Sequence, residues 1–203
     1  MIAIIDYGCG NLNAFTNSFK RLNVKSKIIS KSEDLDGIKK IILPGVGSFD
    51  YVIKSFNNSG LREMVEKKVI NDKIDVLGVC AGMQIMANSS EEGKETGLGW
   101  IAGKVKLIKK EKIKSPTKLP HMGWNDVIPD AANSLFNDII DPKFYFLHSY
   151  FFSSQNPKHK LATTNYGINF TSAAVNGHIY GVQFHPEKSH DWGIKLLKNF
   201  SEL

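Results

Sequence analysis

The cysteine at the centre of G-V-C-A-G, residues 78–82, is the residue of this chain best suited to chemistry. Cys80 follows the apolar run Asp75 to Val79 and precedes a helical pattern that begins near Gly82. A strand that turns sharply into a helix is a nucleophile elbow, and glycines two positions before and after let neighbouring backbone pass close by. A thiol at a helix N-terminus is favoured as the thiolate. The alternative interpretation is a buried apolar cysteine that ends a strand.

A cysteine nucleophile needs a base, and the segment Q-F-H-P-E at 183–187 offers one. In extended chain, side chains two positions apart point the same way, so we expect His185 and Glu187 to share a face while Pro186 stiffens the turn. The carboxylate would then hold the imidazole in the correct tautomer. Alone, H-P-E is better explained by a surface histidine and a solvated carboxylate. Beside an elbow cysteine, it indicates a catalytic pair.

Acyl transfer also requires hydrogen-bond donors for a developing oxyanion. The backbone N–H of Ala81, directly after the nucleophile, is the first candidate. The second is the N–H of Val46 in P-G-V-G at 44–47, because the two glycines permit a peptide flip that would turn this amide toward the thiol. The alternative for 44–47 is an ordinary tight turn.

The elements that must position these groups follow a βαβ pattern in the first half of the chain. Near-continuous apolar runs are typical of buried parallel strands, and the amphipathic stretches between them indicate crossover helices. We therefore expect a mostly parallel central sheet with helices on both faces, a flavodoxin-like α/β fold. The predicted strands are 2–6, 26–30, 40–43 and 75–79, and the predicted helices are 12–22, 49–56 and 83–88.

From Gly103 onward the pattern changes to closely spaced strands, several separated by turn signals such as Asn176-Gly177 and Tyr166-Gly167. We expect these strands to add antiparallel to one edge of the sheet, and an amphipathic helix over 193–200 to close the chain. The predicted strands are 105–108, 125–128, 144–147, 161–165, 172–175 and 179–184. With 203 residues and no internal repeat, residues 1–203 are expected to form one domain.

Composition favours a cytosolic protein. Two cysteines, Cys9 and Cys80, do not make a disulfide framework, and Asp6 comes too early for a secretory apolar stretch. The net charge of +6 gathers largely in 104–118, which has no aromatic interleaving and is interpreted as a solvated, mobile basic loop. The alternative is a docking surface for an acidic partner or a phosphorylated substrate.

No metal and no cofactor are predicted. His148 lies beside a predicted strand and His159 in a polar loop, and neither has metal-ligand spacing with other ligating residues. Trp100, Trp124 and Trp192 are interpreted as packing or interface residues.

Taken together, the motifs resemble the class I, or triad, glutamine amidotransferases, and within that class they are most similar to the glutaminase subunits of imidazole glycerol phosphate synthase. The resemblance runs from Met1 to the terminal helix. It is carried by D-Y-G-x-G-N-L at 6–12, P-G-V-G at 44–47, G-V-C-A-G-M-Q at 78–84, L-P-H-M-G-W-N at 119–125, F-L-H-S-Y at 146–150 and Q-F-H-P-E-K-S at 183–189.

The resemblance implies Cys80 as the nucleophile, His185 as general base and then acid, and Glu187 as the group that orients it. It implies that glutamine is hydrolysed through a γ-glutamyl thioester, and that ammonia passes through an internal channel to a synthase (cyclase) subunit in a heterodimer. The residues implied to hold the amino-acid end of glutamine are Gln84, Glu92, Ser149 and Tyr150, with Glu91 able to align in place of Glu92. The residues implied to face the partner are Lys188 and the region of His121 to Trp124.

Some segments depart from the histidine-pathway pattern. Cys9 occupies the variable position of the first motif, and 166–172 together with 188–190 resemble paralogues of surface-sugar pathways. Those paralogues supply ammonia to an ATP-dependent partner that makes an amidino sugar. Two further hypotheses are a free-standing cysteine hydrolase and a catalytically inactive binding module. The intact Cys80, His185 and Glu187 argue against the inactive module.

Overall fold

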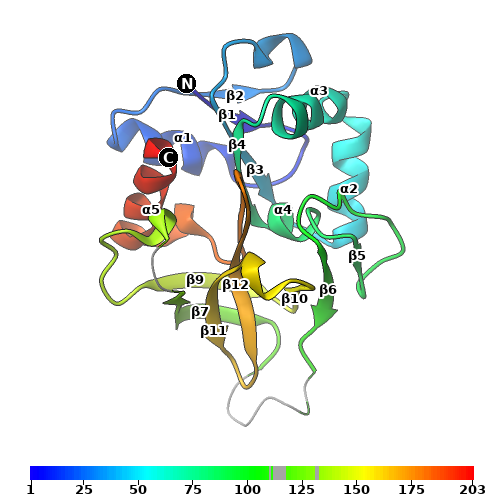
Figure 1. Cartoon of the computed structure of the whole chain (residues 1–203), viewed down its shortest axis with the longest axis vertical. Coiled ribbons are helices and arrows are strands. Elements are labelled where there is room, and N and C mark those ends of the chain that lie inside the picture. The colour runs from blue at the N-terminus through cyan, green and yellow to red at the C-terminus, as the bar shows by residue number, and fades with distance from the viewer. Residues whose placement is uncertain (110, 112–117, 131–132) are drawn as a thin grey trace.

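The computed structural model describes residues 1–109, 111, 118–130 and 133–203. Its centre is an eight-stranded sheet with the order β2-β1-β3-β4-β13-β12-β11-β8 (Figure 1). The strands from β2 to β13 run parallel, and the other three continue the sheet antiparallel at one edge. This confirms the predicted α/β class. The strands are β1 Ile2–Ile5, β2 Ser26–Ile29, β3 Lys40–Gly45, β4 Asp75–Cys80, β8 Ile128–Pro129, β11 Lys160–Asn165, β12 Asn169–Asn176 and β13 Ile179–Val182.

The register of the parallel strands brings three candidate site segments to one edge of the sheet. Gly45 at the end of β3 lies opposite Cys80 at the end of β4, and Val182 at the end of β13 lies opposite Val79. Because parallel strands end at the same edge, the segment after β13, which contains His185, meets the other two there. Ligand sites of open α/β sheets commonly form at this carboxyl edge.

Helices cover both faces of the sheet, as predicted. One core lies between the sheet and helices α2 and α3, and includes Phe49 and Val65. The other lies between the sheet and helices α1 and α5, and includes Phe15 and Phe200 (Figure 1). The helices are α1 Leu12–Arg21, α2 Phe49–Asn58, α3 Arg62–Glu66, α4 Ala81–Gln84 and α5 His190–Glu202.

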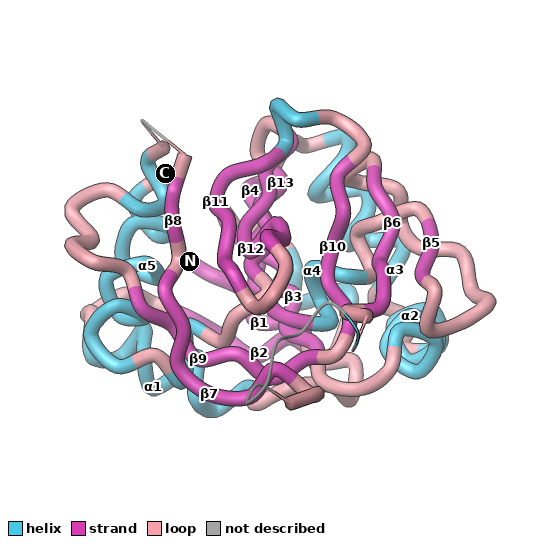
Figure 2. The backbone as a smooth tube through the Cα atoms, turned by 90° about the horizontal axis from the view of Figure 1, so that it is seen from below, coloured by secondary structure: helices cyan, strands magenta, loops and turns pink. Residues whose placement is uncertain are grey.

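Three of the predicted later strands form smaller sheets, contrary to the expectation that they extend the central one. Strand β6 (Gly103–Leu107) pairs with β10 (Tyr150–Ser154) and with the short β5 (Ser89–Ser90). Strand β7 (His121–Asp126) pairs with β9 (Lys143–His148) (Figure 2). These two small sheets flank the carboxyl edge of the parallel strands, so they supply walls for the site. The predicted strand 179–184 also differs, because β13 is parallel to β4.

The helix predicted over 83–88 is a single turn, Ala81–Gln84. After it, the N–H groups of Met86 and Ala87 bond carbonyls three residues back instead of four, so the α-helical pattern ends. Helix α3, the π-helical turn Lys67–Asn71 that follows it and strand β10 were not predicted. Much of the predicted basic loop, residues 110 and 112–117, lies outside the described residues, and 103–107 form β6. Among the residues described, none of the helices is long and apolar enough to cross a membrane.

The approach of the elbow to β3 gives a first prediction. A Cβ atom on Gly82 would lie 2.0 Å from the carbonyl oxygen of Leu43, so Gly82→Ala must push two backbone segments apart. We expect a loss of unfolding free energy at or above the upper end of the ~1–3 kcal/mol typical of overpacking, measured by chemical denaturation.

The matched control is Gly177→Asn. Gly177 has a φ of +62° and no atom within 4 Å of an added Cβ, and asparagine tolerates this conformation. A loss of about 1 kcal/mol or less is expected. Equal losses for the two variants would contradict the steric argument.

Candidate active site

Cys80 lies at the turn from β4 into α4 with a φ of 54° and a ψ of −114°. A non-glycine residue with positive φ costs on the order of 1–3 kcal/mol and persists only where the surroundings enforce it. Here the enforcement comes from close glycine contacts, because a Cβ on Gly78 would lie 2.8 Å from the carbonyl oxygen of Gly82. The sequence prediction of an elbow is therefore matched by the backbone.

His185 and Glu187 form a buried ion pair. His185 Nδ1 lies 2.8 Å from Glu187 Oε1, and the two side chains are 3% and 2% exposed. They meet across a 3-10 turn, Pro186–Lys188, and not along an extended strand as the sequence analysis expected. The turn brings the carboxylate back against the ring. Glu187 Oε2 has no hydrogen-bond partner among the described residues.

Ser189, which the sequence analysis did not identify, fixes the backbone of this turn. Its hydroxyl donates to the carbonyl of His185 at 2.6 Å and accepts the N–H of Tyr145 at 3.0 Å. The N–H of His185 in turn donates to the carbonyl of Tyr145 at 2.9 Å. These three bonds attach the histidine to β9. In the sequence, Ser189 is marked only by its place as the last residue of the motif Q-F-H-P-E-K-S.

Charge stabilises the protonated form of the His185 ring. Burial lowers the pKa of His185, but the hydrogen bond and negative charge of Cys80, followed by those of Glu187, outweigh it and raise the pKa to about 10. The ring is therefore a cation at neutral pH. Because α4 is only one turn long, this cation is a stronger electrostatic partner for the sulfur than the helix dipole.

Gln183 is a second side chain that contacts the sulfur, and it was also missed. Its Nε2 donates to Cys80 Sγ at 3.8 Å, and its Oε1 accepts a bond of 3.0 Å from Gln84 Nε2. Gln84 Nε2 also donates to the carbonyl of Tyr150 at 3.0 Å. Gln183 is 0% exposed, so this chain of amides is shielded from water. It connects the sulfur to the wall of the site.

A cavity of about 200 Å³ opens above Cys80 and brings most of the predicted site residues together. This is smaller than the roughly 300–1,000 Å³ of pockets for drug-sized ligands, so it suits a small metabolite. Glu187 lies behind His185, and neither His121 nor Trp124 lines the cavity. The lining residues are Val46, Gly47, Cys80, Ala81, Gln84, Glu92, Leu147, His148, Ser149, Tyr150, His185 and Lys188.

The structure separates the two adjacent glutamates. Glu92 lines the cavity, and its Oε2 accepts the N–H of Phe49 at 2.8 Å in the first turn of α2. Glu91 turns away, and its Oε2 accepts the N–H of Leu107 at 3.0 Å. Glu92 is therefore the carboxylate available to a ligand in the cavity.

The loop that carries Val46 is anchored at one end. The hydroxyl of Tyr7 donates to the carbonyl of Pro44, so β3 is fixed as far as the Pro44–Gly45 peptide. Val46 is 49% exposed, and Gly47 has a φ of +127°, a conformation that favours glycine. The N–H of Val46 belongs to the Gly45–Val46 peptide, which lies between the anchored Pro44 carbonyl and Gly47. Ala81 is buried at the first position of α4.

Two of the three predicted interface residues lie on the surface. Lys188 is exposed, and Trp124 is 41% exposed and stacks on His190 at 5.2 Å between ring centroids. His121 is 2% exposed, so its ring does not contribute to the surface. The alternation of side chains along β7 turns His121 inward and exposes its neighbour Met122.

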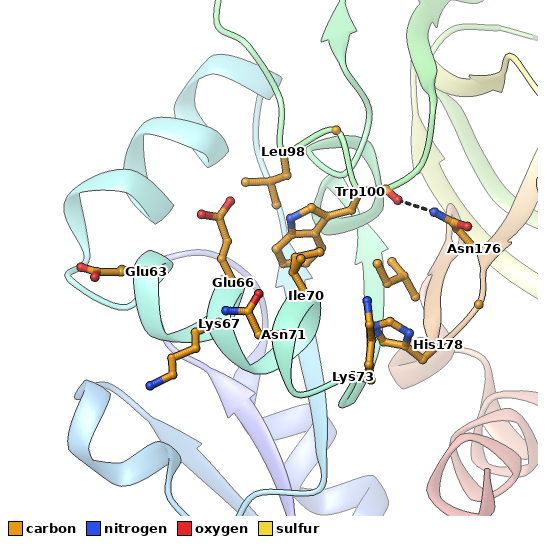
Figure 3. Close-up of a pocket in the computed structure, with 13 residues that line it drawn as sticks. Glu63, Glu66, Lys67, Ile70, Asn71, Lys73, Leu98, Trp100, Asn176 and His178 are labelled. Atoms are coloured by element: carbon orange, nitrogen blue, oxygen red, sulfur yellow. Dashed lines mark hydrogen bonds between the residues drawn. The ribbon is translucent and has the colours of Figure 1, made fainter.

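A larger hollow of about 850 Å³ lies elsewhere (Figure 3). It is lined by Ile70, by Trp100 and by the β12–β13 turn, where Asn176 Nδ2 donates to the carbonyl of Trp100 at 2.9 Å. That turn precedes β13, so the hollow lies away from the carboxyl edge that holds Cys80. Its charged side chains are carboxylates and lysines without a nucleophile, so we assign the chemistry to the smaller cavity.

The second cysteine, Cys9, plays no part in the cavity. Cys9 is buried in the core, where burial raises its pKa, and it lines no wall of the site. Within residues 1–109, 111, 118–130 and 133–203, no three His, Cys, Asp or Glu side chains gather as metal ligands.

The cationic ring yields a second prediction. In Cys80→Ser the negative charge beside His185 is removed, so the pKa of His185 should fall from about 10 toward neutrality. The nitrogen chemical shifts of the histidine rings, followed by NMR against pH, measure this. Cys9→Ser is the control and should leave the His185 titration unchanged. An unchanged pKa in Cys80→Ser would show that the sulfur does not interact with the ring.

Comparison with known proteins agrees with this geometry. A family model described as "Glutamine amidotransferase class-I" matches residues 3–202. A Bdellovibrio bacteriovorus protein named "Imidazole glycerol phosphate synthase subunit HisH" is 52% identical, covering 100% of both chains. A Pseudomonas aeruginosa protein named "Imidazole glycerol phosphate synthase subunit HisH 2" is 42% identical, again over 100% of both.

Solved structures support the fold. A structure described as a glutamine amidotransferase superposes with a TM-score of 0.77 at 20% identity, covering 100% of this chain and 98% of the other. The structure of PurLQS from Thermotoga maritima gives a TM-score of 0.74 at 14% identity, covering 99% and 97%. The chain therefore belongs to the class I glutamine amidotransferase family and is a glutamine-hydrolysing enzyme.

Proposed function

We propose that this chain is the glutaminase subunit of an imidazole glycerol phosphate synthase and that Cys80, His185 and Glu187 carry the reaction. The observation that carries the proposal is the cationic, buried His185 between the Cys80 sulfur and the Glu187 carboxylate at the floor of a cavity of about 200 Å³. Beside an imidazolium, the Cys80 sulfur can attack a carboxamide carbon as the thiolate, which is the nucleophilic form of cysteine.

The first half-reaction releases ammonia. The sulfur of Cys80 bonds to the carboxamide carbon of glutamine, and the carbonyl electron pair moves onto oxygen. The N–H groups of Ala81 and Val46 stabilise that oxyanion, and His185 gives its proton to the leaving nitrogen. Ammonia departs and a γ-glutamyl thioester remains on Cys80.

The second half-reaction regenerates the enzyme. His185, now neutral, takes a proton from water, and the hydroxide attacks the thioester carbon. The carbon–sulfur bond breaks, the thiolate and imidazolium are restored, and the product leaves as glutamate after its new γ-carboxyl group gives a proton to the solvent. Glu187 orients the ring and stabilises its charge in both halves without itself being protonated.

The cavity walls match an amino-acid substrate. Glu92 offers a carboxylate to the α-ammonium of glutamine, and Gln84, Ser149 and Tyr150 line the remaining wall. Charge-assisted bonds of this kind favour a charged amino acid over a neutral amide.

The partner in this proposal is a synthase (cyclase) chain in a cytoplasmic heterodimer, to which ammonia passes through an internal channel. The names of the relatives, which describe subunits, support it. The exposed apolar side chains of Met122 and Trp124, with Lys188 at the cavity rim, provide a surface for that chain. The surface-sugar pathway is the second candidate, favoured by the residues at 166–172 and 188–190 that resemble its paralogues.

The third prediction concerns the order of losses among active-site variants. Cys80→Ala and His185→Ala should each lower turnover of glutamine by about 10⁶-fold, and Glu187→Gln by about 10⁴-fold, because only orientation and charge are lost in the last. Glutamate release measures all three. Cys9→Ala, the matched control, should stay near wild type. Activity of Cys80→Ala within tenfold of wild type would refute the assignment.

The fourth prediction concerns the loop at Val46. If its amide turns toward the oxyanion only when a partner is bound, the isolated chain should be slower by about 10²–10³-fold, the cost of one missing oxyanion donor. Glutamate release by the chain alone and with its partner and acceptor substrate tests this. Full activity of the chain alone would favour a free-standing hydrolase.

The same preparations separate the two pathways. With Cys80→Ala, the partner should still use free ammonia, because the two chemistries occupy separate sites. Co-purification with a (β/α)₈-barrel chain, together with a histidine requirement after gene deletion, is expected. Co-purification with an ATP-dependent amidating chain and growth without histidine would select the surface-sugar alternative.

A further inference from the structure

A pair of buried histidines lies between the cavity wall and the outer surface of the β7–β9 sheet. His121 Nδ1 and His148 Nε2 are 2.9 Å apart, and the rings are 2% and 6% exposed. At one end, His148 Nδ1 lies 2.8 Å from the carbonyl oxygen of Tyr150. At the other, Asn125 Nδ2 lies 3.2 Å from His121 Nε2. The four groups form a continuous row of hydrogen bonds.

The direction of every bond in this row follows from its two ends. The Tyr150 carbonyl can only accept, so His148 carries its proton on Nδ1. Its Nε2 is then an acceptor, which requires a proton on Nδ1 of His121. His121 Nε2 therefore accepts from the Asn125 amide. That amide orientation is fixed independently, since Asn125 Nδ2 also donates to the carbonyl of Asn165 at 2.9 Å and Oδ1 accepts the N–H of Asp126 at 2.8 Å.

Both rings are neutral, so neither is a proton carrier. Burial lowers the pKa of His121 to about 4. Burial, followed by the repulsion that two adjacent imidazolium cations would experience, lowers the pKa of His148 to about 3. All four ring nitrogens are occupied by the row, which leaves none free for a substrate. A structural or positioning role remains.

The carbonyl at the inner end belongs to the wall of the glutamine cavity. It accepts two bonds, one from His148 and one from Gln84, which itself bonds Gln183 beside the Cys80 sulfur. Because His148 bonds a carbonyl two residues ahead, its ring closes a loop around the peptides of Ser149. These two donors hold the segment on its cavity side, while the N–H of Ile108, which donates to the Ser149 carbonyl at 2.9 Å, holds it from β6.

The outer end is clamped by aromatic stacking. The His121 ring lies between Tyr166 and Phe146, with ring centroids 3.9 Å and 4.6 Å away and planes within 21° and 17° of parallel. Tyr166 belongs to the β11–β12 turn, and its hydroxyl donates to the carbonyl of Lys118 at 2.6 Å. A ring held on both faces cannot tilt to adopt another hydrogen-bond partner, so His121 keeps His148 in place.

We propose that His148 is a positioning residue for glutamine, that it sets the affinity of the cavity by holding the Ser149–Tyr150 backbone, and that His121 acts only through it. The inference rests on the proposed function, because it takes glutamine as the ligand of this cavity. Each of the two rings can adopt only one tautomer, so the hydrogen bonds along the row hold the cavity wall in one conformation.

The test is steady-state glutamine hydrolysis by the chain with its synthase partner bound. His148→Phe keeps an aromatic ring among Phe146 and Phe170 but removes one donor from the Tyr150 carbonyl. We expect KM for glutamine to rise by about 3- to 10-fold, the effect of one hydrogen bond, with kcat within about twofold. His121→Phe should raise KM less, and the double variant should match His148→Phe alone, because His121 acts through His148.

His178→Phe is the matched control. His178 Nε2 also bonds a backbone carbonyl, that of Val69 at 2.7 Å. His178 lines the larger hollow (Figure 3), and Cys80 does not. It should lower the melting temperature and leave KM unchanged. If His148→Phe behaved in the same way, the histidine pair would be structural only and the inference would be wrong, while wild-type hydrolysis would still support the proposed function.

The nitrogen chemical shifts of the wild-type rings provide a readout that does not depend on how the variants fold. At neutral pH both His121 and His148 should be neutral with the proton on Nδ1. A proton on Nε2 of either neutral ring, or an imidazolium, would overturn the proposed row. Absence of glutamine hydrolysis by the wild-type complex would instead refute the proposed function itself.

Discussion

The close approach of the β3 strand to the turn at Cys80 is the constraint on which the site depends. A Cβ on Gly45 would lie 2.1 Å from the backbone nitrogen of Gly82, so only glycine allows β3 and α4 to meet at this distance. The contact holds Cys80 in its left-handed conformation and places the Val46 loop beside the thiol. One backbone contact therefore fixes the turn at Cys80 and brings the Val46 loop beside it.

The second requirement is the stabilisation of charge without water. His185 and Glu187 are almost fully buried, and burying one such charge alone costs several kcal/mol. The imidazolium is stable because it has an anion on each side, the sulfur and the carboxylate. Gln183 and Ser189 complete the environment by fixing the sulfur and the histidine backbone. Removal of the imidazolium would leave the buried Glu187 carboxylate without its ion-pair partner.

The small sheets give the site its walls and its connection to the surface. Strand β9 ends in the segment that lines the cavity, and β7 beside it exposes Met122 and Trp124 on the outer side. The same two strands carry His148 and His121, whose hydrogen bonds link the wall to the β11–β12 turn. Substrate binding and the partner surface in the proposed function thus share one pair of strands.

Local chemistry determined the parts of the protein that could be predicted from its sequence, and tertiary structure alone decided the rest. The elbow follows from the glycines two positions on either side of Cys80, and the parallel strands follow from their apolar runs. Both could be predicted because short-range steric limits and the periodicity of burial depend only on residues within one segment of the chain. By contrast, Gln183 contacts a sulfur 103 positions away, and His121 is turned inward by pairing with a strand 27 positions later. The choice of Glu92 over Glu91 likewise depends on distant partners. A long-range contact of this kind produces no periodic pattern in the nearby sequence, because the packing of the strands determines which residues meet and the neighbouring residues do not.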